Sequence, residues 1–371
     1  MESKDEYAAE GSFVLLIPGK IRVDRLHLQL ASWMGISRFV LKRLLFSTAV
    51  VLGVMSLTFI VSRVIIPDPA RAWAGLHAGP QALAALRARF HLNDPIYVQY
   101  YYYLSDLLRG DWGVSPSSGQ PVLYSIILYL PATIELAFSS LLIIIFIGIP
   151  LGVVAATHRN KLEDHVARAV ALSGVAAPPF LAALLLQLIF FYYLRIFPDS
   201  GGRISALITP PSTVTGLLIV DSLIALDFQS LFSAIEHLIL PSFALAFITL
   251  GLMSRLVRAS MLETLASDYV RTAKAKGLKR RIVIYKHALK NALIQPVTAL
   301  SVYMAYLLGG SVVIELIFSW PGVGRYAAQA ALQFDLPAVM GTTLAFTICV
   351  VVANLVADLL NAALDPRIRL G

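Results

Sequence analysis

The residues that suggest a chemical role form a polar, basic run between two apolar stretches. Residues 267–281 read Ser-Asp-Tyr-Val-Arg-Thr-Ala-Lys-Ala-Lys-Gly-Leu-Lys-Arg-Arg, and His-Ala-Leu-Lys-Asn follows at 287–291. Charges and unpaired backbone groups are costly in hydrocarbon, so this run must form a hydrophilic loop on one side of a bilayer. Ser267 or Asp268 can cap the start of a helix, and Gly277 stands where a left-handed residue would end it. We therefore predict a short helix between two membrane spans, suited to transmitting force from a soluble partner.

The other polar residues show no pattern of a catalytic or metal site. Four histidines are candidates for metal ligands: His158, His165, His237 and His287. No two of them have the spacing of metal ligands with carboxylates nearby. The sequence has no nucleophile–base constellation and no Gly-x-x-x-x-Gly-Lys-Ser/Thr phosphate loop. The single cysteine, Cys349, excludes an internal disulfide. We predict that the chain is not an enzyme and that it binds no metal or cofactor itself.

Four polar residues fall in or near apolar stretches: Glu135, Glu315, Asn354 and Asp358. An ionisable side chain in such a place is a functional candidate, and a proton-driven carrier could use it as a relay. Glu135 and Glu315 stand near the ends of their stretches, within reach of water or helix N-termini. We favour structural pairing for these residues, with the proton relay as the alternative.

The composition is that of an integral membrane protein. Of the 371 residues, 58% are hydrophobic and 14% are charged, and the mean hydropathy is +0.75, far from the soluble average. A helical crossing needs about 20 apolar residues. Six stretches meet or approach that length: 39–66, 133–156, 170–197, 238–256, 292–317 and 338–363. We predict an all-α polytopic membrane protein with six transmembrane helices, the third of them interrupted by Pro178-Pro179.

The basic residues predict which side of the membrane each loop faces. With six spans and an inner N-terminus, 22 of the 30 Lys and Arg residues fall on the inner side, as the positive-inside rule requires. Both termini are therefore expected in the cytoplasm, with residues 1–38 as an N-terminal tail and 257–291 as the main inner loop. This topology explains the net charge of +8, and no nucleic-acid partner is needed.

Two outer segments are expected between the spans. Residues 67–130 form the first, and helical spacing of apolar residues within 80–109 predicts one or two short helices there. Residues 198–237 form the second, which is loop-like around Gly201-Gly202 and Pro210-Pro211. Its apolar middle, 214–226, would rest on the membrane or on a partner. Residues 131–369 then make up the core membrane domain.

The polar run resembles the cytoplasmic coupling loop of the dipeptide/oligopeptide-type ABC importer permeases. The resemblance rests on Asp-Tyr-Val-Arg-Thr-Ala-Lys-Ala-Lys-Gly-Leu at 268–278 and His-Ala-Leu-Lys-Asn-Ala-Leu at 287–293. Further stretches typical of that family recur in order: Leu-Leu-Arg-Gly-Asp-Trp-Gly at 107–113, Leu-Pro-Ala-Thr-Ile-Glu-Leu at 130–136, Gly-Ile-Pro-Leu-Gly at 148–152, His-Leu-Ile-Leu-Pro at 237–241, Phe-Ser-Trp-Pro-Gly-Val-Gly-Arg at 318–325 and Leu-Asp-Pro-Arg-Ile-Arg at 364–369. The long first outer segment resembles that of the first of the two permeases in such systems.

The resemblance implies that the polar loop contacts separate ATP-hydrolysing subunits. The residues it assigns to this ATPase-coupling loop are Asp268, Tyr269, Arg271, Thr272, Ala273, Lys274, Ala275, Gly277, His287 and Leu289. Only Ala273, Gly277 and Leu289 match the broader importer signature, so no salt bridge of its acidic version is carried over. The small Ala273 and Gly277 would let the helix insert closely into a cleft, and Tyr269 would fill an aromatic pocket. The alternative is an ordinary solvated loop kept basic for topology.

The stretch at 318–325 is expected to form a short outer turn beside the translocation path. Its residues are Trp320, Pro321, Gly322 and Gly324. Trp320 would lie at the membrane interface, and the two glycines would allow the bend.

The resemblance also implies the remaining machinery. The fold would be that of a type I ABC importer permease in the plasma membrane of a bacterium or archaeon. The expected partners are a homologous second permease subunit, two cytoplasmic ATPase subunits that bind ATP and Mg, and an extracytoplasmic solute-binding protein. The solute would be a peptide or a short oligosaccharide, with nickel or another small solute as the alternative. A stand-alone secondary transporter or a channel subunit, neither of which requires ATPases, is the rival interpretation.

Overall fold

The computed structural model describes residues 41–66, 68–74, 79–199 and 201–364, and the described chain is helical without a β-strand. Its only extended pairing there is an isolated bridge between Val114 and Pro121. The predicted tail, residues 1–38, lies outside the described residues, as does the C-terminal stretch after residue 364.

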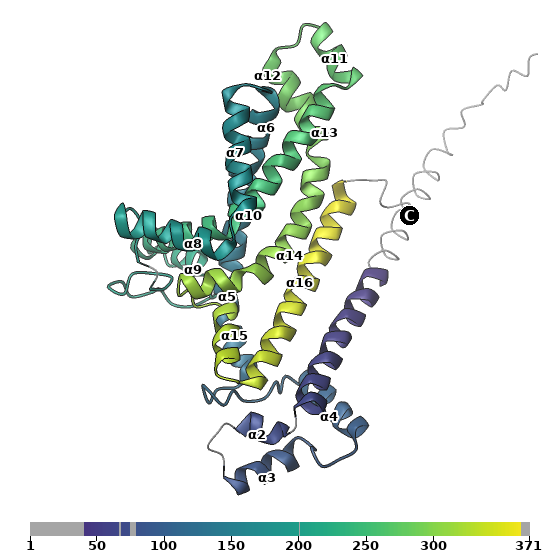
Figure 1. Ribbon diagram of the computed structural model, residues 1–371, viewed down its shortest axis with the longest axis vertical. Helices are drawn as coiled ribbons and strands as arrows, with labels where there is room; N and C mark the ends of the chain where they lie inside the picture. Colours follow the sequence, from purple (N-terminus) through teal and green to yellow (C-terminus); the bar gives the residue numbers. More distant parts are fainter. Residues whose placement is uncertain (1–40, 67, 75–78, 200, 365–371) are drawn as a thin grey trace, which may run out of the picture.

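The first membrane helix (Leu41–Ile65) ends in a π-helical turn and leads into three short helices (Figure 1). These elements are η1 (Val61–Ile65), α2 (Pro69–Ala74), α3 (Pro80–Arg89) and α4 (Ile96–Leu108). The short helices predicted within 80–109 are thus confirmed as α3 and α4. Tyr100 and Tyr103 of α4 hydrogen-bond to Ser56 and Thr58, at 2.6 and 2.7 Å. These two bonds dock the outer helices onto the membrane helix.

The second and third apolar stretches both contain prolines, but only the third is broken at them. The second forms one continuous helix, Val122–Thr157, built from α5 (Val122–Ile143), η2 (Ile144–Gly148) and α6 (Ile149–Thr157). The third divides into α7 (Leu162–Ala176), then α8 (Pro179–Leu186) with η3 (Gln187–Tyr193), at an angle of 114°. Ala177 is extended (ψ 128°), because a residue before proline avoids the helical region. The predicted break at Pro178-Pro179 is confirmed, and the stretch is not a straight span.

The rest of the described chain runs from the second outer segment to the last long helix. Its elements are α9 (Leu218–Ile224), α10 (Phe228–Leu265), α11 (Asp268–Ala275), α12 (Arg280–Ile282), η4 (Val283–Ala288), α13 (Leu289–Ala292), α14 (Ile294–Ile317), α15 (Val323–Leu332) and α16 (Leu336–Leu364). The second outer segment is loop-like over 201–217 and helical in α9. Helix α10 begins at Phe228, well before residue 238, the predicted start of the fourth span.

Four of the described helices are long and apolar enough to cross a membrane, and two bent pairs raise the number to six if each pair is one span. The four are Leu41–Ile65, Val122–Thr157, Phe228–Leu265 and Leu336–Leu359. The bent pairs are α7 with α8–η3, and α12–α13 with α14, the latter bent by 50°. By length and composition, the described residues therefore contain four to six candidate membrane crossings, all of them helical.

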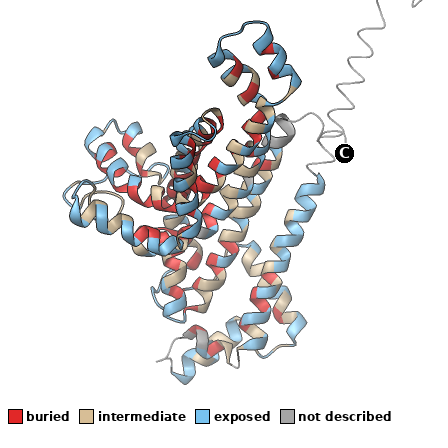
Figure 2. Cartoon of the chain, turned by 45° about the horizontal axis from the view of Figure 1, so that its top comes forward, coloured by how far each residue is buried: buried red, intermediate tan, exposed pale blue. Residues whose placement is uncertain are grey.

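The core gathers around α10, which lies between α5, α6, α7 and α14. Over half of its apolar window is buried (56%), against 17% for the first membrane helix, and Figure 2 shows the same contrast. Two glycines permit this packing. A Cβ on Gly251 of α10 would lie 2.5 Å from the carbonyl oxygen of Ala171 in α7, and one on Gly152 of α6 would lie 2.6 Å from that of Ser254. Small residues thus bring the three backbones together, as is common between membrane helices.

Candidate functional site

The short helix predicted in the polar run is present as α11, at the end of the bundle opposite the outer helices α2–α4 (Figure 1). Ser267 is the N-cap residue in an extended conformation, although its side chain makes no capping hydrogen bond. Gly277 has φ +73°, and the amide of Leu278 donates to the carbonyl of Ala273 across the helix end (3.4 Å). This is the left-handed termination that glycine permits at low cost.

One side of α11 is anchored in the chain's own core. Val270 and Ala273 are 0% and 6% exposed, and both belong to the main apolar cluster. The interpretation of Ala273 as part of a small outward face is therefore wrong: its methyl group points into the protein. Because the helix has only two turns, burial of one residue per turn fixes its orientation and leaves the remaining side chains outside.

The exposed side of α11 is polar and basic, with one aromatic ring. Its members are Asp268, Tyr269, Arg271, Thr272, Lys274 and Ala275, with Gly277 just beyond. The Tyr269 hydroxyl accepts a hydrogen bond from the Asn291 side chain (2.9 Å). Arg271 lies 3.5 Å from Asp268, but both side chains are 80% or more exposed, so this pair contributes little. The structure thus brings these predicted residues together on one accessible surface.

The two other predicted coupling residues lie behind this surface. His287 in η4 and Leu289 at the start of α13 are half-buried, and Leu289 packs against the main core. They support α11 rather than extend its exposed side. A cavity of about 400 Å³ separates the segment from the end of α6, lined by Thr157, Lys274 and Arg280 among others. Arg280 closes one side of it by donating to the carbonyl of Thr157 (3.0 Å).

A buried ion pair near the same end was not predicted from the sequence. Asp164 of α7 is completely buried, and Arg258 of α10 donates to both of its oxygens, at 2.7 and 2.9 Å. The amide of Asn160 adds a third hydrogen bond (2.9 Å). Nothing in the spacing of these residues along the chain indicates the pair, because it depends on the packing of α7 against α10. It fastens the α6–α7 turn to the helix that leads into α11.

The predicted outer turn lies between α14 and α15, and α15 continues beyond it towards the start of α16 (Figure 1). Trp320 is 1% exposed, and its indole N–H donates to the carbonyl of Ala132 in α5 (2.8 Å). The prediction that Trp320 lies at the membrane interface is therefore wrong. Pro321 follows it half-buried. Gly324 is buried as well, and a Cβ there would lie 2.7 Å from the Cα of Val312, so the glycine is required by close packing.

The side chain of Glu315 lies beneath this turn and hydrogen-bonds to it. Its carboxylate is completely buried and accepts hydrogen bonds from the Thr133 hydroxyl and from the amide of Arg325, both at 2.9 Å. The Thr133 oxygen in turn accepts from the amide of Val323 (2.9 Å). The carboxylate and hydroxyl thus satisfy amides at the start of α15, where a negative charge is also favoured by the helix dipole.

Glu135, half a turn further along α5, holds the second outer segment. It lies 2.5 Å from the guanidinium of Arg203 and accepts from the amide of Ile219 (2.8 Å) at the start of α9. Arg203 also donates to the carbonyl of Gly216 (3.0 Å). Asp358 likewise pairs with Arg43, at 3.0 Å. The structural pairing favoured for Glu135, Glu315 and Asp358 is thus confirmed by their contacts. We call the set Thr133, Glu135, Arg203, Glu315 and Trp320 the outer junction.

Comparison with known proteins decides what this architecture belongs to. Residues 148–370 match the family described as the binding-protein-dependent transport system inner membrane component. Residues 36–137 match the N-terminal family of such membrane components. The chain belongs to this family. It is therefore a membrane component of a transport system rather than an enzyme.

This chain covers almost the whole length of the curated relatives described next. The probable D,D-dipeptide transport system permease protein DdpB of Escherichia coli K12 is 42% identical over 322 residues, 87% of this chain and 94% of the relative. The dipeptide transport system permease protein DppB of Alkalihalophilus pseudofirmus is 41% identical over 331 residues, 89% and 99% of the two chains. The glutathione transport system permease protein GsiC of Salmonella choleraesuis is 34% identical over 331 residues, 89% and 98%.

Family membership bears on two parts of this structure, the exposed side of α11 and the outer junction. A membrane component of this family works in a transport system that depends on a solute-binding protein. The exposed basic side of α11 lies at the end of the bundle away from the outer helices α2–α4 (Figure 1), and the outer junction lies where α5 packs against α14 and α15.

Proposed function

We propose that this chain is one of two homologous permease subunits in an ATP-driven importer of small peptides. It crosses the plasma membrane six times with both termini in the cytoplasm, and two separate ATPase subunits drive it between inward-open and outward-open states. The names of the relatives support the solute class, since they are permeases for dipeptides, D,D-dipeptides and glutathione.

The observation that carries the proposal is the construction of α11. Two buried residues, Val270 and Ala273, fix the helix to the core, while its exposed side offers Tyr269 and several basic groups to a partner. A helix fixed in this way transmits a push into α10 and η4, whereas a loosely attached loop would absorb it. The ATPase subunits therefore bind this exposed side, and Arg271 and Lys274 set their orientation by charge.

The topology follows from the same arrangement. The ATPases are cytoplasmic, so α11 faces the cytoplasm and the helices α2–α4, at the opposite end of the bundle, face outward. The inner basic loops support this orientation through the positive-inside rule. The outer helices then meet the solute-binding protein.

The test is assembly and coupled ATP hydrolysis. The full-length chain is co-expressed with a second permease and ATPase subunits of the same organism, purified, and reconstituted with the binding protein. We expect the ATPases to co-purify and solute-loaded binding protein to stimulate hydrolysis. Tyr269→Ala should weaken ATPase co-purification, whereas Tyr97→Ala, at a more exposed tyrosine of the outer segment, should not. Uphill solute uptake by vesicles that hold this chain without ATPases would overturn the proposal.

The solute class has its own test. The binding protein that stimulates hydrolysis by the reconstituted complex is titrated with dipeptides, short oligosaccharides and nickel. Tight binding of dipeptides alone is the expected result, and selective binding of oligosaccharide or nickel would refute the peptide assignment without touching the coupling mechanism.

A further inference from the structure

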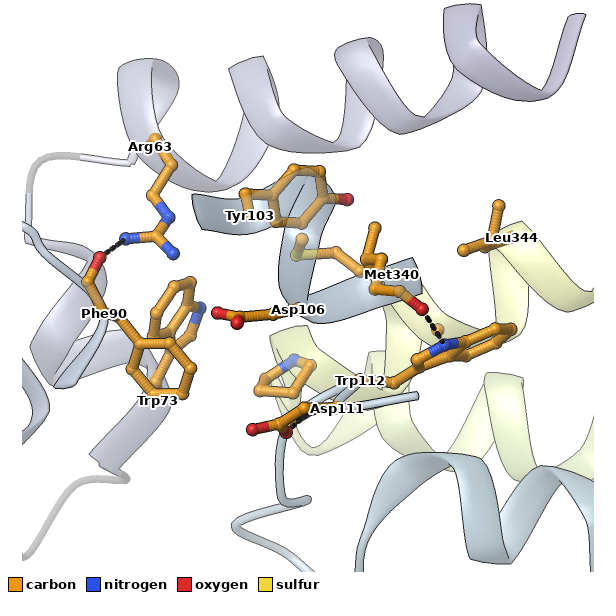
Figure 3. A pocket seen from close by; sticks show the side chains of 13 residues that line it. Arg63, Trp73, Phe90, Tyr103, Asp106, Asp111, Trp112, Met340 and Leu344 are labelled. Carbon is orange, nitrogen blue, oxygen red and sulfur yellow. Dashed lines mark hydrogen bonds between the residues drawn. The ribbon is translucent and has the colours of Figure 1, made fainter. Parts of the chain in front are cut away.

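A small cavity lies where the first membrane helix, the outer helices and α16 meet (Figure 3). Its volume is about 50 Å³, and the rings of Trp73, Phe90 and Trp112 form much of its wall. Arg63 enters from the end of the membrane helix and Asp106 from α4. Neither α11 nor the outer junction contributes a residue, so the cavity is separate from the sites described above.

Two hydrogen-bond donors in this cavity have no acceptor. The indole N–H of Trp73 is buried without a partner, and the side chain is 9% exposed. The Nε–H of Arg63 is also buried and unpaired, although Nη1 of the same guanidinium donates to the carbonyl of Phe90 (3.0 Å). Because buried donors are almost always satisfied by protein or by ordered water, these two groups indicate an acceptor, water or a ligand, that occupies the cavity.

One acceptor in the cavity has no donor. The carboxylate of the half-buried Asp106 points towards the indole of Trp73 (Figure 3). Its charge acts on Arg63, but within the described part of the chain the carboxylate accepts no hydrogen bond. The neighbouring Asp111, by contrast, already accepts from Arg89 (3.1 Å) and from the amide of Gly113 (3.1 Å). Asp106 is therefore the carboxylate left for a ligand.

The charges around the cavity exclude an ion as its occupant. Arg63 offsets Asp106, and Arg89 offsets Asp111. An anion would supply acceptors but would face the Asp106 carboxylate, and a cation would supply donors but would face the guanidinium of Arg63 and leave both N–H groups unpaired. A neutral group that accepts and donates at once meets all three needs.

We propose that this cavity binds a neutral carboxamide. The amide oxygen accepts from Trp73 and Arg63, and the amide N–H donates to Asp106. The planar group lies against the aromatic walls, which cover its apolar faces. Peptide bonds and the side chains of asparagine and glutamine present this chemistry. Without such a ligand the cavity has room for a few water molecules, about 10–15 Å³ each.

Three isosteric probes separate the possibilities: acetamide accepts and donates, acetate only accepts, and acetamidinium only donates. The full-length chain is labelled with ¹⁵N at the tryptophan indoles, placed in lipid nanodiscs and observed by NMR, with Trp73→Phe identifying the Trp73 signal. We expect acetamide alone to shift that signal saturably, in the millimolar range expected for so few atoms. N-methylacetamide, a peptide-bond analogue, then distinguishes a peptide bond from a side-chain amide by which of the two binds more tightly.

Two other tryptophans of the protein serve as internal controls for the NMR measurement. The indole N–H groups of Trp112 and Trp320 already donate to the carbonyls of Leu107 (3.2 Å) and Ala132 (2.8 Å), so their signals should stay in place and report that the fold is intact. Asp106→Ala should weaken acetamide binding by about tenfold or more, the effect of losing a charge-assisted hydrogen bond. Asp94→Ala, whose carboxylate pairs with His91 (2.8 Å), should not. An equal response to acetate or acetamidinium, or no response to any probe, would overturn the proposal.

Discussion

The hydroxyl of Thr133 donates a 2.9 Å hydrogen bond to the buried carboxylate of Glu315, and this contact joins α5 to α14 beneath the outer turn. The same hydroxyl accepts from the amide of Val323. Glu135 lies on the next half-turn of α5 and holds the second outer segment through Arg203. A short stretch of α5, directly after Pro131 within the helix, thus fastens two outer elements. We infer that these elements move together with α5 during transport.

Thr133→Val should destabilise the protein strongly, although valine has nearly the same shape as threonine. It leaves the Val323 amide and one oxygen of Glu315 without a partner inside the core, at about 1–3 kcal/mol for each group. We expect the unfolding temperature in detergent to fall by several degrees. Thr298→Val is the matched control, since that exposed hydroxyl only bonds within its own helix. Equal unfolding temperatures for the two variants would contradict the assigned role.

Arg258→Gln should be among the most damaging substitutions on α10. It leaves the completely buried Asp164 without its bidentate partner, and breaking such a pair costs about 3–5 kcal/mol. Arg168 lies 3.5 Å from the same carboxylate and is 42% exposed, so it compensates only in part. Thermal unfolding should show the loss, and Asp164→Asn should restore part of it in the double variant. Arg255→Gln, an exposed arginine of the same helix, should have little effect; a similar loss there would argue against the pair.

The second outer segment should loosen in acid through Asp221. Burial alone would raise the pKa of this carboxyl, but its hydrogen bonds to the amides of Thr215 and Gly216 and to the Thr215 hydroxyl lower the pKa overall. A lowered folded-state pKa contributes stability above the unfolded value, about 3.9, and this stability is lost as the pH falls through the folded-state value.

Hydrogen exchange of residues 203–221 measures this effect between pH 6 and the lowest pH at which the protein stays folded, after correction for intrinsic rates. We expect protection to fall at acid pH in the wild type. Asp221→Asn should show weak protection at every pH. An unchanged pH dependence in that variant would assign the effect to another group.

Gly277→Val should damage coupling more than folding. A β-branched residue at φ +73° strains the backbone by about 1–2 kcal/mol, and the termination of α11 would shift. The space around Gly277 is open, so no clash with the core follows. We expect normal membrane insertion with ATP hydrolysis that no longer responds to solute. Gly277→Asn should retain most coupling, because asparagine tolerates this conformation; full coupling in Gly277→Val would refute the argument.

Several local features could be predicted because they depend on a few adjacent residues. The start of α11 near Ser267, its left-handed end at Gly277 and the break at Pro178-Pro179 follow from backbone preferences that neighbours do not override. The apolar composition likewise set the membrane class, since hydrocarbon admits little else.

Other features could not be predicted because they depend on which surfaces meet. Trp320 and Ala273 face the core rather than the lipid or a partner, and no sequence pattern distinguishes these outcomes. The Asp164–Arg258 pair joins residues 94 positions apart, and the cavity beside Trp73 draws on three separate regions of the chain.

The sequence by itself determined that this chain lies in a membrane and presents a short capped basic helix, because polarity and backbone preference are local properties. Only the tertiary structure decided which polar groups are paired in the interior and which, like Trp73 and Asp106, remain open to a ligand. The physical reason is that a buried polar group is satisfied or left unpaired by neighbours that packing brings to it from distant parts of the chain.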